Sequence, residues 1–164
     1  MPISGPLFER VASAPTVPAG LPLVIALTGF TDAGGAVSGL IEYMREEREP
    51  SPLVVFSNDI LLDYRARRPI ISFDEDHLTD YRPPRLEFSL VEDALGHPFV
   101  LLSGYEPDFA WDAFVDVVLQ FAQEADVATV TQDHTGPNLE CVVVGEDDRA
   151  RVAGQAQVDR TGRL

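Results

Sequence analysis

The segment of this chain best suited to chemistry is a run of three arginines beside an acid and a tyrosine. Its members are Asp63, Tyr64, Arg65, Arg67 and Arg68. Guanidinium groups form planar, two-pronged hydrogen bonds to carboxylates and phosphates, so the run favours recognition of an anion or an acidic peptide. Alternatively, these cations pair inside the protein or across a subunit contact, with Asp59, Asp63 or the acidic turn at 74–76 as partners. Both interpretations stay open, and internal pairing is slightly favoured in so acidic a chain.

A second candidate site is the glycine-rich turn at 29–35, between a predicted strand and a predicted helix. Backbone N–H groups at a helix start can hold an anion, and Gly34 and Gly35 would let the ligand approach closely. Asp32 is the predicted N-cap. The spacing matches neither the P-loop nor the dinucleotide-binding fingerprint, so a tight turn capped by Asp32 is the simpler interpretation.

The composition excludes several function classes. All 12 basic residues among the 164 are arginine, which removes lysine-dependent chemistry such as Schiff bases, the pyridoxal anchor and the P-loop phosphate contact. The net charge of −15 opposes general binding to nucleic acid or to anionic lipid. We therefore expect no nucleic-acid and no membrane partner, and a cytoplasmic protein.

The other reactive side chains form no pattern typical of catalysis. His77, His97 and His134 share no metal-ligand spacing, and the single cysteine, Cys141, lies in an apolar run typical of a buried thiol. Ser103 lacks the surroundings of a nucleophile elbow. The sequence thus predicts no catalytic residue, no metal site and no cofactor.

Hydrophobic patterning predicts an α/β fold with a mainly parallel central sheet. Apolar runs at 21–27 and 53–57 flank a helical pattern that ends near 47, which indicates a strand–helix–strand crossover. Further strands are expected at 70–73, 85–91, 98–103 and 127–130, with an amphipathic helix at about 111–125. The alternation at 85–91 predicts one solvent-facing side, at an edge or in a hairpin. Residues 1–144 are predicted to form one domain, and 145–164 a polar, disordered tail.

Two stretches carry a resemblance to a known family. The turn at 29–35 followed by a helix and strand, then Asp59 and the run from Leu61 to Pro69, resembles the proteasome assembly chaperone 2 family of actinobacteria. The strand at 98–103, residues 104–108 and the helix bearing Trp111 are similar to that family as well. The resemblance covers residues 5–130. It implies a three-layer α/β/α fold related to nucleoside phosphorylases, usually in homo-oligomers.

The resemblance also implies a non-enzymatic role in assembling proteasome subunits. The rival is a phosphate- or nucleoside-binding enzyme of phosphorylase-like ancestry. Some relatives are labelled ATP-dependent carboxylate–amine ligases, a label that the missing lysine opposes here. Family members continue beyond the length of this chain, so we expect a C-terminally truncated or frame-shifted member. The predicted binding surface is Arg65, Arg67 and Arg68, with the Gly34–Gly35 turn beside it.

Overall fold

A computed structural model describes residues 6–29, 35–74, 76–132 and 141–143. Its helices are α1 (Ala36–Glu47), α2 (Asn58–Leu61) and α3 (Trp111–Glu124). Its strands are β1 (Phe8–Arg10), β2 (Pro22–Thr28), β3 (Ser51–Phe56), β4 (Ile70–Asp74), β5 (His77–Arg82), β6 (Glu87–Glu92), β7 (Pro98–Tyr105), β8 (Thr129–Gln132) and β9 (Cys141–Val143). Asp32, Gly34 and the predicted tail at 145–164 lie outside the described residues.

The central sheet is mixed in direction. Seven described strands follow the order β1-β3-β6-β7-β2-β8-β9. Parallel pairing joins β2 to β7 and to β8, whereas the other four described pairings are antiparallel. The α/β class is confirmed, but the prediction of a mainly parallel sheet was wrong. The expected crossover from β2 through α1 to β3 exists only in a wider form, because β6 and β7 lie between those two strands.

The strand whose environment was predicted wrongly is β6. It pairs with β7 as the predicted hairpin partner, and Asp93 fixes the turn by accepting hydrogen bonds from the backbone of Leu95 (2.8 Å) and His97 (2.9 Å). However, β6 lies inside the sheet, between β3 and β7, and its polar residues Glu87 and Ser89 are buried. The alternating pattern was correct, but the inference of a solvent-facing side was not, because α1 covers that side.

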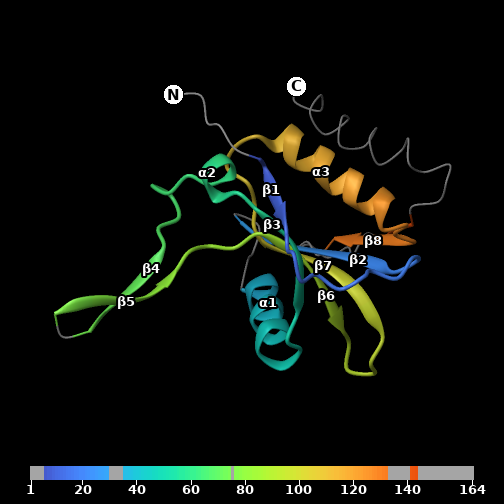
Figure 1. The fold of residues 1–164 in the computed structure, drawn as a ribbon, viewed down its shortest axis with the longest axis horizontal. Helices are drawn as coiled ribbons and strands as arrows, with labels where there is room; N and C mark the ends of the chain where they lie inside the picture. The colour runs from blue at the N-terminus through green and yellow to red at the C-terminus, as the bar shows by residue number, and fades with distance from the viewer. Residues whose placement is uncertain (1–5, 30–34, 75, 133–140, 144–164) are drawn as a thin grey trace.

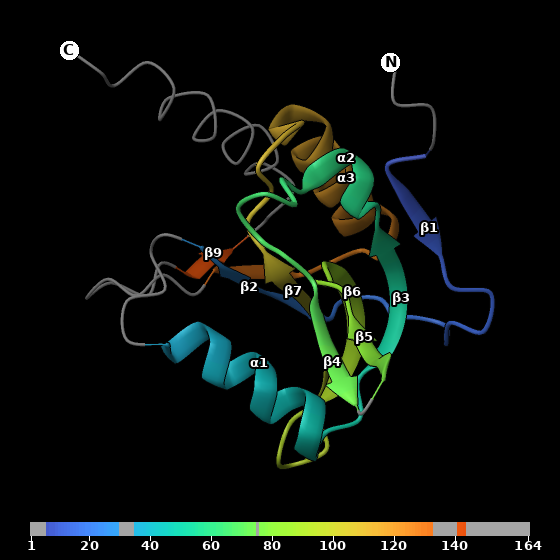
Figure 2. The same ribbon diagram turned by 90° about the vertical axis from the view of Figure 1, so that its left-hand side faces the viewer.

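Helices pack on both faces of this sheet (Figures 1 and 2). On one face, Phe114 and Phe121 of α3 pack onto the apolar side chains of β2, β3, β6 and β7, and the Phe88 and Phe121 rings stack 4.1 Å apart. On the other face, Val37 and Ile41 of α1 contact Ala26 and neighbours from β6 and β7. Successive residues of β2 and β7 alternate between these two cores, which explains why both strands are continuously apolar.

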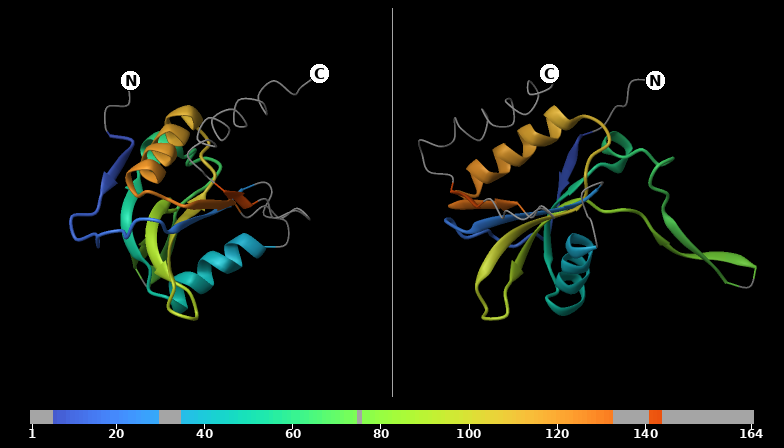
Figure 3. Two further views of the ribbon diagram at one scale, coloured as in Figure 1. Left: turned by 90° about the vertical axis from the view of Figure 1, so that its right-hand side faces the viewer. Right: turned by 180° about the vertical axis from the view of Figure 1, so that it is seen from behind.

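A second, two-stranded sheet of β4 and β5 stands apart from this body. It projects as a hairpin well beyond the main sheet (Figures 1 and 3). None of its described residues belongs to either core cluster. The expected strand at 70–73 is therefore present, but outside the central sheet.

No helix within the described ranges is long and apolar enough to cross a membrane; α3, the longest, has 14 residues.

Candidate functional site

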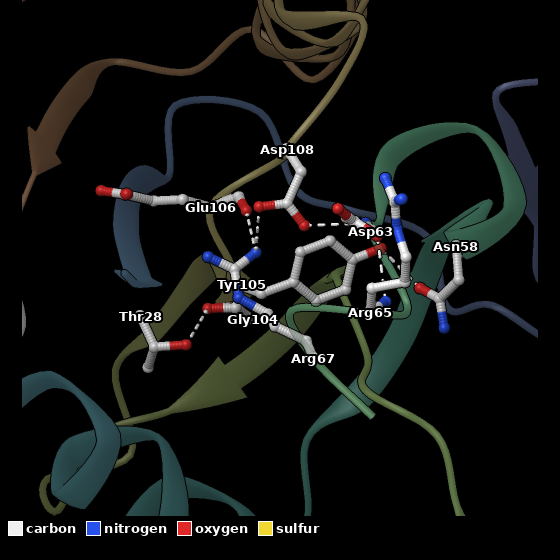
Figure 4. Close-up of polar contacts among 9 residues, drawn as sticks. All are labelled: Thr28, Asn58, Asp63, Arg65, Arg67, Gly104, Tyr105, Glu106 and Asp108. Atoms are coloured by element: carbon white, nitrogen blue, oxygen red, sulfur yellow. Dashed lines mark hydrogen bonds and ion pairs between the residues drawn. The ribbon is translucent and has the colours of Figure 1, made fainter. Parts of the chain in front are cut away.

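The arginine-rich loop at 63–69 is fastened to the end of β7. The Arg67 guanidinium donates a hydrogen bond to the backbone carbonyl of Glu106 (2.6 Å) and lies 3.1 Å from the carboxylate of Asp108 (Figure 4). It also lies over the ring of Tyr105, 5.7 Å from the centroid. Less than a third of either the Arg67 or the Asp108 side chain is exposed. Arg67 therefore acts as an internal clamp, which supports the internal-pairing interpretation for this residue.

A second attachment runs through the backbone of the loop. The backbone N–H of Asp63 donates to Asp108 (2.8 Å), while the Asp63 carboxylate accepts from the backbone N–H of Arg65 (2.9 Å). That hydrogen bond from Arg65 lowers the pKa of Asp63 from its ordinary value. Asp108 thus holds both Asp63 and Arg67, and it fixes the start and the middle of the loop.

The tyrosine beneath the clamp is tied to α2. The Tyr105 hydroxyl donates to Oδ1 of Asn58 (2.5 Å), and the Asn58 amide donates to the carbonyl of Pro84 (2.7 Å). Burial raises the pKa of Tyr105 well above its usual range. These contacts join three segments that are distant in sequence: α2, the end of β7 and the strand-to-strand connection before β6.

The remaining predicted residues of the loop point outward. The Arg65 side chain is 90% exposed and its guanidinium lies 3.4 Å from the Asp63 carboxylate, while Tyr64 is also exposed. Partial burial of the Tyr64 phenol raises its pKa, and the charge of Asp59 adds to that effect. Arg68 follows the clamp and leads into β4. The loop therefore divides into a clamp, Arg67, and a second set formed by Tyr64, Arg65 and Arg68, which we call the outer arginine surface.

A cleft of about 540 Å³ lies on the α1 side of the same strand ends. Its polar lining consists of Thr28, Ser38, Glu42, Arg45, Glu46, Arg67, Arg85 and Tyr105, so two carboxylates accompany the three guanidiniums. Thr28, Gly104 and Tyr105 stand at the carboxyl ends of the parallel neighbours β2 and β7, where α/β proteins commonly bind ligands. The cleft brings Arg67 together with residues of α1, the helix that follows the glycine-rich turn.

The glycine turn itself contributes one described residue of the prediction. Gly35 has φ 72° and is the N-cap of α1, so the prediction that Asp32 caps this helix was wrong. Among the residues that the structure describes, no side-chain hydrogen bond caps the helix here; Ser38 donates back to the carbonyl of Gly35 (3.3 Å). Gly35 is not among the residues that line the cleft.

Sequence reasoning missed four residues that build this site: Asn58, Tyr105, Asp108 and Glu87. The Glu87 carboxylate is buried with only 7% of its side chain exposed, 3.3 Å from the guanidinium of Arg85. That distance indicates an ion pair, although within the described part of the chain its Oε2 accepts no well-aligned hydrogen bond. The available signal was position, because Asn58 and Tyr105 both lie at or just after the end of a buried strand.

Across the described residues, no group of three or more metal-ligating side chains converges.

Comparisons with known proteins cover the larger part of the chain. The sequence profile of the PAC2 family matches residues 26–156. A protein of unknown function from Corynebacterium glutamicum has 30% identity and a TM-score of 0.73, with 77% of this chain and 49% of that chain covered. A Mycobacterium tuberculosis protein of unknown function has 35% identity and a TM-score of 0.70, with 77% of this chain and 44% of that chain covered.

A third solved structure, the proteasome-assembly chaperone homologue of Mycobacterium tuberculosis, has 25% identity and a TM-score of 0.60, with 68% of this chain and 48% of that chain covered. No curated protein matches the chain. The chain thus spans about half the length of the solved structures that it resembles. The profile match and these structures confirm the expected resemblance, and the chain belongs to the PAC2 family.

Proposed function

We propose that this chain is a non-enzymatic assembly factor that binds protein partners through the outer arginine surface, as a homo-oligomer in the cytoplasm. The observation that carries the proposal is the difference in exposure among the loop side chains: Arg67 is bound internally, whereas Arg65 and Tyr64 are exposed. A loop fixed at Asp63 and Arg67 has little backbone freedom left to lose when its outer guanidiniums bind a partner. Arginine and tyrosine are also the residues enriched where proteins meet.

The family relationship points to the class of partner. One similar structure is that of a proteasome-assembly chaperone homologue, so proteasome subunits are the first partners to test. We also propose that the fold is a phosphorylase-like three-layer sandwich. The packing of α1 and α3 on opposite faces of the sheet supports this proposal.

Binding to immobilised proteasome subunits tests the proposal. The double variant Arg65→Ala/Arg68→Ala should lose binding at least tenfold. Arg10→Ala/Arg48→Ala is the matched control, because it removes the same charge from β1 and from the C-cap of α1, outside both the arginine loop and the cleft. Equal loss in both doubles would indicate non-specific electrostatic attraction and would count against the outer arginine surface.

The cleft favours a second candidate, a phosphate- or nucleoside-binding enzyme. Arg45, Arg67 and Arg85 all line it at the ligand-binding edge of the sheet. A thermal-shift screen with inorganic phosphate, nucleosides and nucleotides tests this candidate. Arg45→Gln is the informative variant, since Arg67→Ala would also release the loop. Stabilisation by one compound that disappears in Arg45→Gln would favour the enzyme, and no shift with any compound would oppose it.

A further inference from the structure

The cleft lies at a topological switch point of the central sheet. The strands β2 and β7 are parallel neighbours, but the chain leaves β2 for α1 on one face of the sheet and leaves β7 for α3 on the other face. Open α/β sheets bind ligands in the crevice outside the carboxyl ends of two such strands. The cleft volume of about 540 Å³ is in the range of small-molecule sites. Its position and size therefore indicate a site for a small molecule.

One side of α1 lines the cleft with charged groups. Its residues are three and four positions apart, so they share one side of the helix: Ser38, Ile41, Glu42, Arg45 and Glu46. Of these, Ile41 is the one apolar residue, and it is buried. A helix side that only packed onto the sheet would be apolar. This side of α1 therefore presents two carboxylates and a guanidinium to whatever enters the cleft.

The protein itself holds the two other guanidiniums of the cleft in place. The contacts of Arg67 with the carbonyl of Glu106 (2.6 Å) and with Asp108 (3.1 Å) both use its Nη1 atom. Arg85 meets the buried carboxylate of Glu87 through its Nε atom, at 3.3 Å. A guanidinium has N–H donors on all three of its nitrogen atoms. Each of these arginines therefore keeps terminal N–H groups that can bind a ligand carboxylate.

The balance of charge around the cleft decides which ligand fits. Asp108 and Glu87 each face one of the guanidiniums, and the lining itself adds Glu42 and Glu46. Four carboxylates thus accompany three guanidiniums, in a chain with a net charge of −15. A phosphate group would add a charge of about −1.5 to −2 to this field. A ligand with one ammonium and one carboxylate group satisfies both kinds of side chain and adds no net charge.

We propose that the cleft binds a small zwitterion, an amino acid or a short peptide with free ends. The ligand carboxylate binds the terminal N–H groups of Arg67 and Arg85. The ligand ammonium binds Glu42 and Glu46, which lie one helical turn apart on α1. The proposal shares the cleft with the second candidate function but assigns a ligand of different charge and requires no catalysis. It is also independent of the outer arginine surface.

A thermal-shift screen of the full chain with the standard amino acids and with short peptides tests the proposal and separates the two sources of the zwitterion. Calorimetry then gives the dissociation constant of the best binder. That constant should rise at least about tenfold when the ligand amino group is acetylated, and again when the ligand carboxylate is amidated instead. The proposal is wrong if none of these compounds binds, or if the blocked ligands bind as well as the free one.

The variant Glu42→Gln/Glu46→Gln removes the proposed ammonium site, and both side chains are exposed. It should weaken the zwitterion at least about tenfold and strengthen its acetylated analogue at least about threefold, because the guanidiniums remain while two negative charges are lost. Glu9→Gln/Glu47→Gln is the matched control, since it makes the same change of charge at exposed residues outside the cleft. Circular dichroism establishes that both doubles are folded.

Three results with these proteins would overturn the proposal. They are equal loss of affinity in both doubles, unchanged affinity in Glu42→Gln/Glu46→Gln, and stronger stabilisation of the wild type by phosphate or a nucleotide than by any zwitterion. The last result would favour the second candidate function. None of the three would affect the binding test for proteasome subunits.

Discussion

Replacing Gly104 by alanine should remove a large part of the stability of this protein. Gly104 has φ 145°, a conformation that side chains rarely adopt. A Cβ at this position would lie 2.2 Å from the carbonyl oxygen of Arg85 and 2.7 Å from Cα of Leu86. Both obstacles are backbone atoms of the segment that enters β6, so no flexible side chain can move aside.

The expected loss has two parts. A strained backbone conformation costs about 1–3 kcal/mol, and forcing atoms into a packed region costs about 1–3 kcal/mol more. We therefore expect Gly104→Ala to lower the free energy of unfolding by about 2–6 kcal/mol. That is a large fraction of the about 5–15 kcal/mol typical of a domain.

Two matched glycines separate these contributions. Gly96 has φ 82°, but no atom would lie within 4 Å of an added Cβ, so Gly96→Ala should cost only the backbone term, about 1–2 kcal/mol. Gly39 lies inside α1, where an added Cβ would also meet no atom within 4 Å. Gly39→Ala should therefore stabilise the protein by about 0.5–1 kcal/mol. The free energy of unfolding should therefore rise in Gly39→Ala, fall modestly in Gly96→Ala and fall strongly in Gly104→Ala.

Urea unfolding followed by far-ultraviolet circular dichroism measures all three variants against the wild type. The slope of the transition should stay constant while its midpoint moves. A Gly104→Ala variant within about 0.5 kcal/mol of Gly96→Ala would refute the reasoning, because the overlap with the backbone of Arg85 and Leu86 would then cost nothing.

Three further predictions concern the loop and its anchor. Arg67→Ala should lower the free energy of unfolding by about 1.5–3 kcal/mol in urea unfolding, since it removes a charged hydrogen bond to a carbonyl and leaves Asp108 without its cation. The pKa of Asp63 is lowered in the folded state, so its contribution to the free energy of unfolding is present above about pH 4 and is lost as the pH falls through the pKa of the folded state. Asp63→Asn should therefore reduce the loss of stability at acid pH. The pKa of Tyr105 is raised, so stability should fall as the pH rises above about 10, where the unfolded chain ionises first. Tyr105→Phe should lessen that fall and leave the part that Tyr64 causes, and absorbance at the tyrosinate band should show one fewer late-titrating group.

Patterning predicted the elements of the fold better than their arrangement. The strands at β2, β3 and β7 and the helix α3 follow from apolar runs and helical periodicity, which depend on local sequence. Strand order depends on long-range contacts that periodicity does not encode. The sequence of β6 alternates as a half-exposed strand would, yet Glu87 and Ser89 are buried on the face that α1 covers, and only the folded chain reveals that cover.

In the candidate site, too, the sequence predicted the residues better than their arrangement. The arginine run was identified from residue type and spacing alone, and internal pairing was the favoured interpretation for it. Which arginine is internal could not be predicted, because the acceptor of Arg67 is the backbone carbonyl of Glu106, and every residue has such a group. Trp111, the first residue of the predicted amphipathic helix, is 42% exposed and contacts Phe114 edge-on. The helix was predicted correctly, but its first residue lies at the rim of the core.

The arrangement of β3 and β6 draws attention to the long segment that connects them. These strands are antiparallel neighbours, and a few residues would be enough to connect them. The chain instead uses residues 57–86, which hold α2, the arginine loop and the β4–β5 hairpin. Leu61 and Leu62 anchor this excursion in the core, and Asn58 and Arg67 tie it to the end of β7. The strands β3 and β6 could pair without so long a connection, and ordering it costs conformational entropy. This cost is consistent with selection for what the connection presents, a fixed loop and a projecting apolar hairpin.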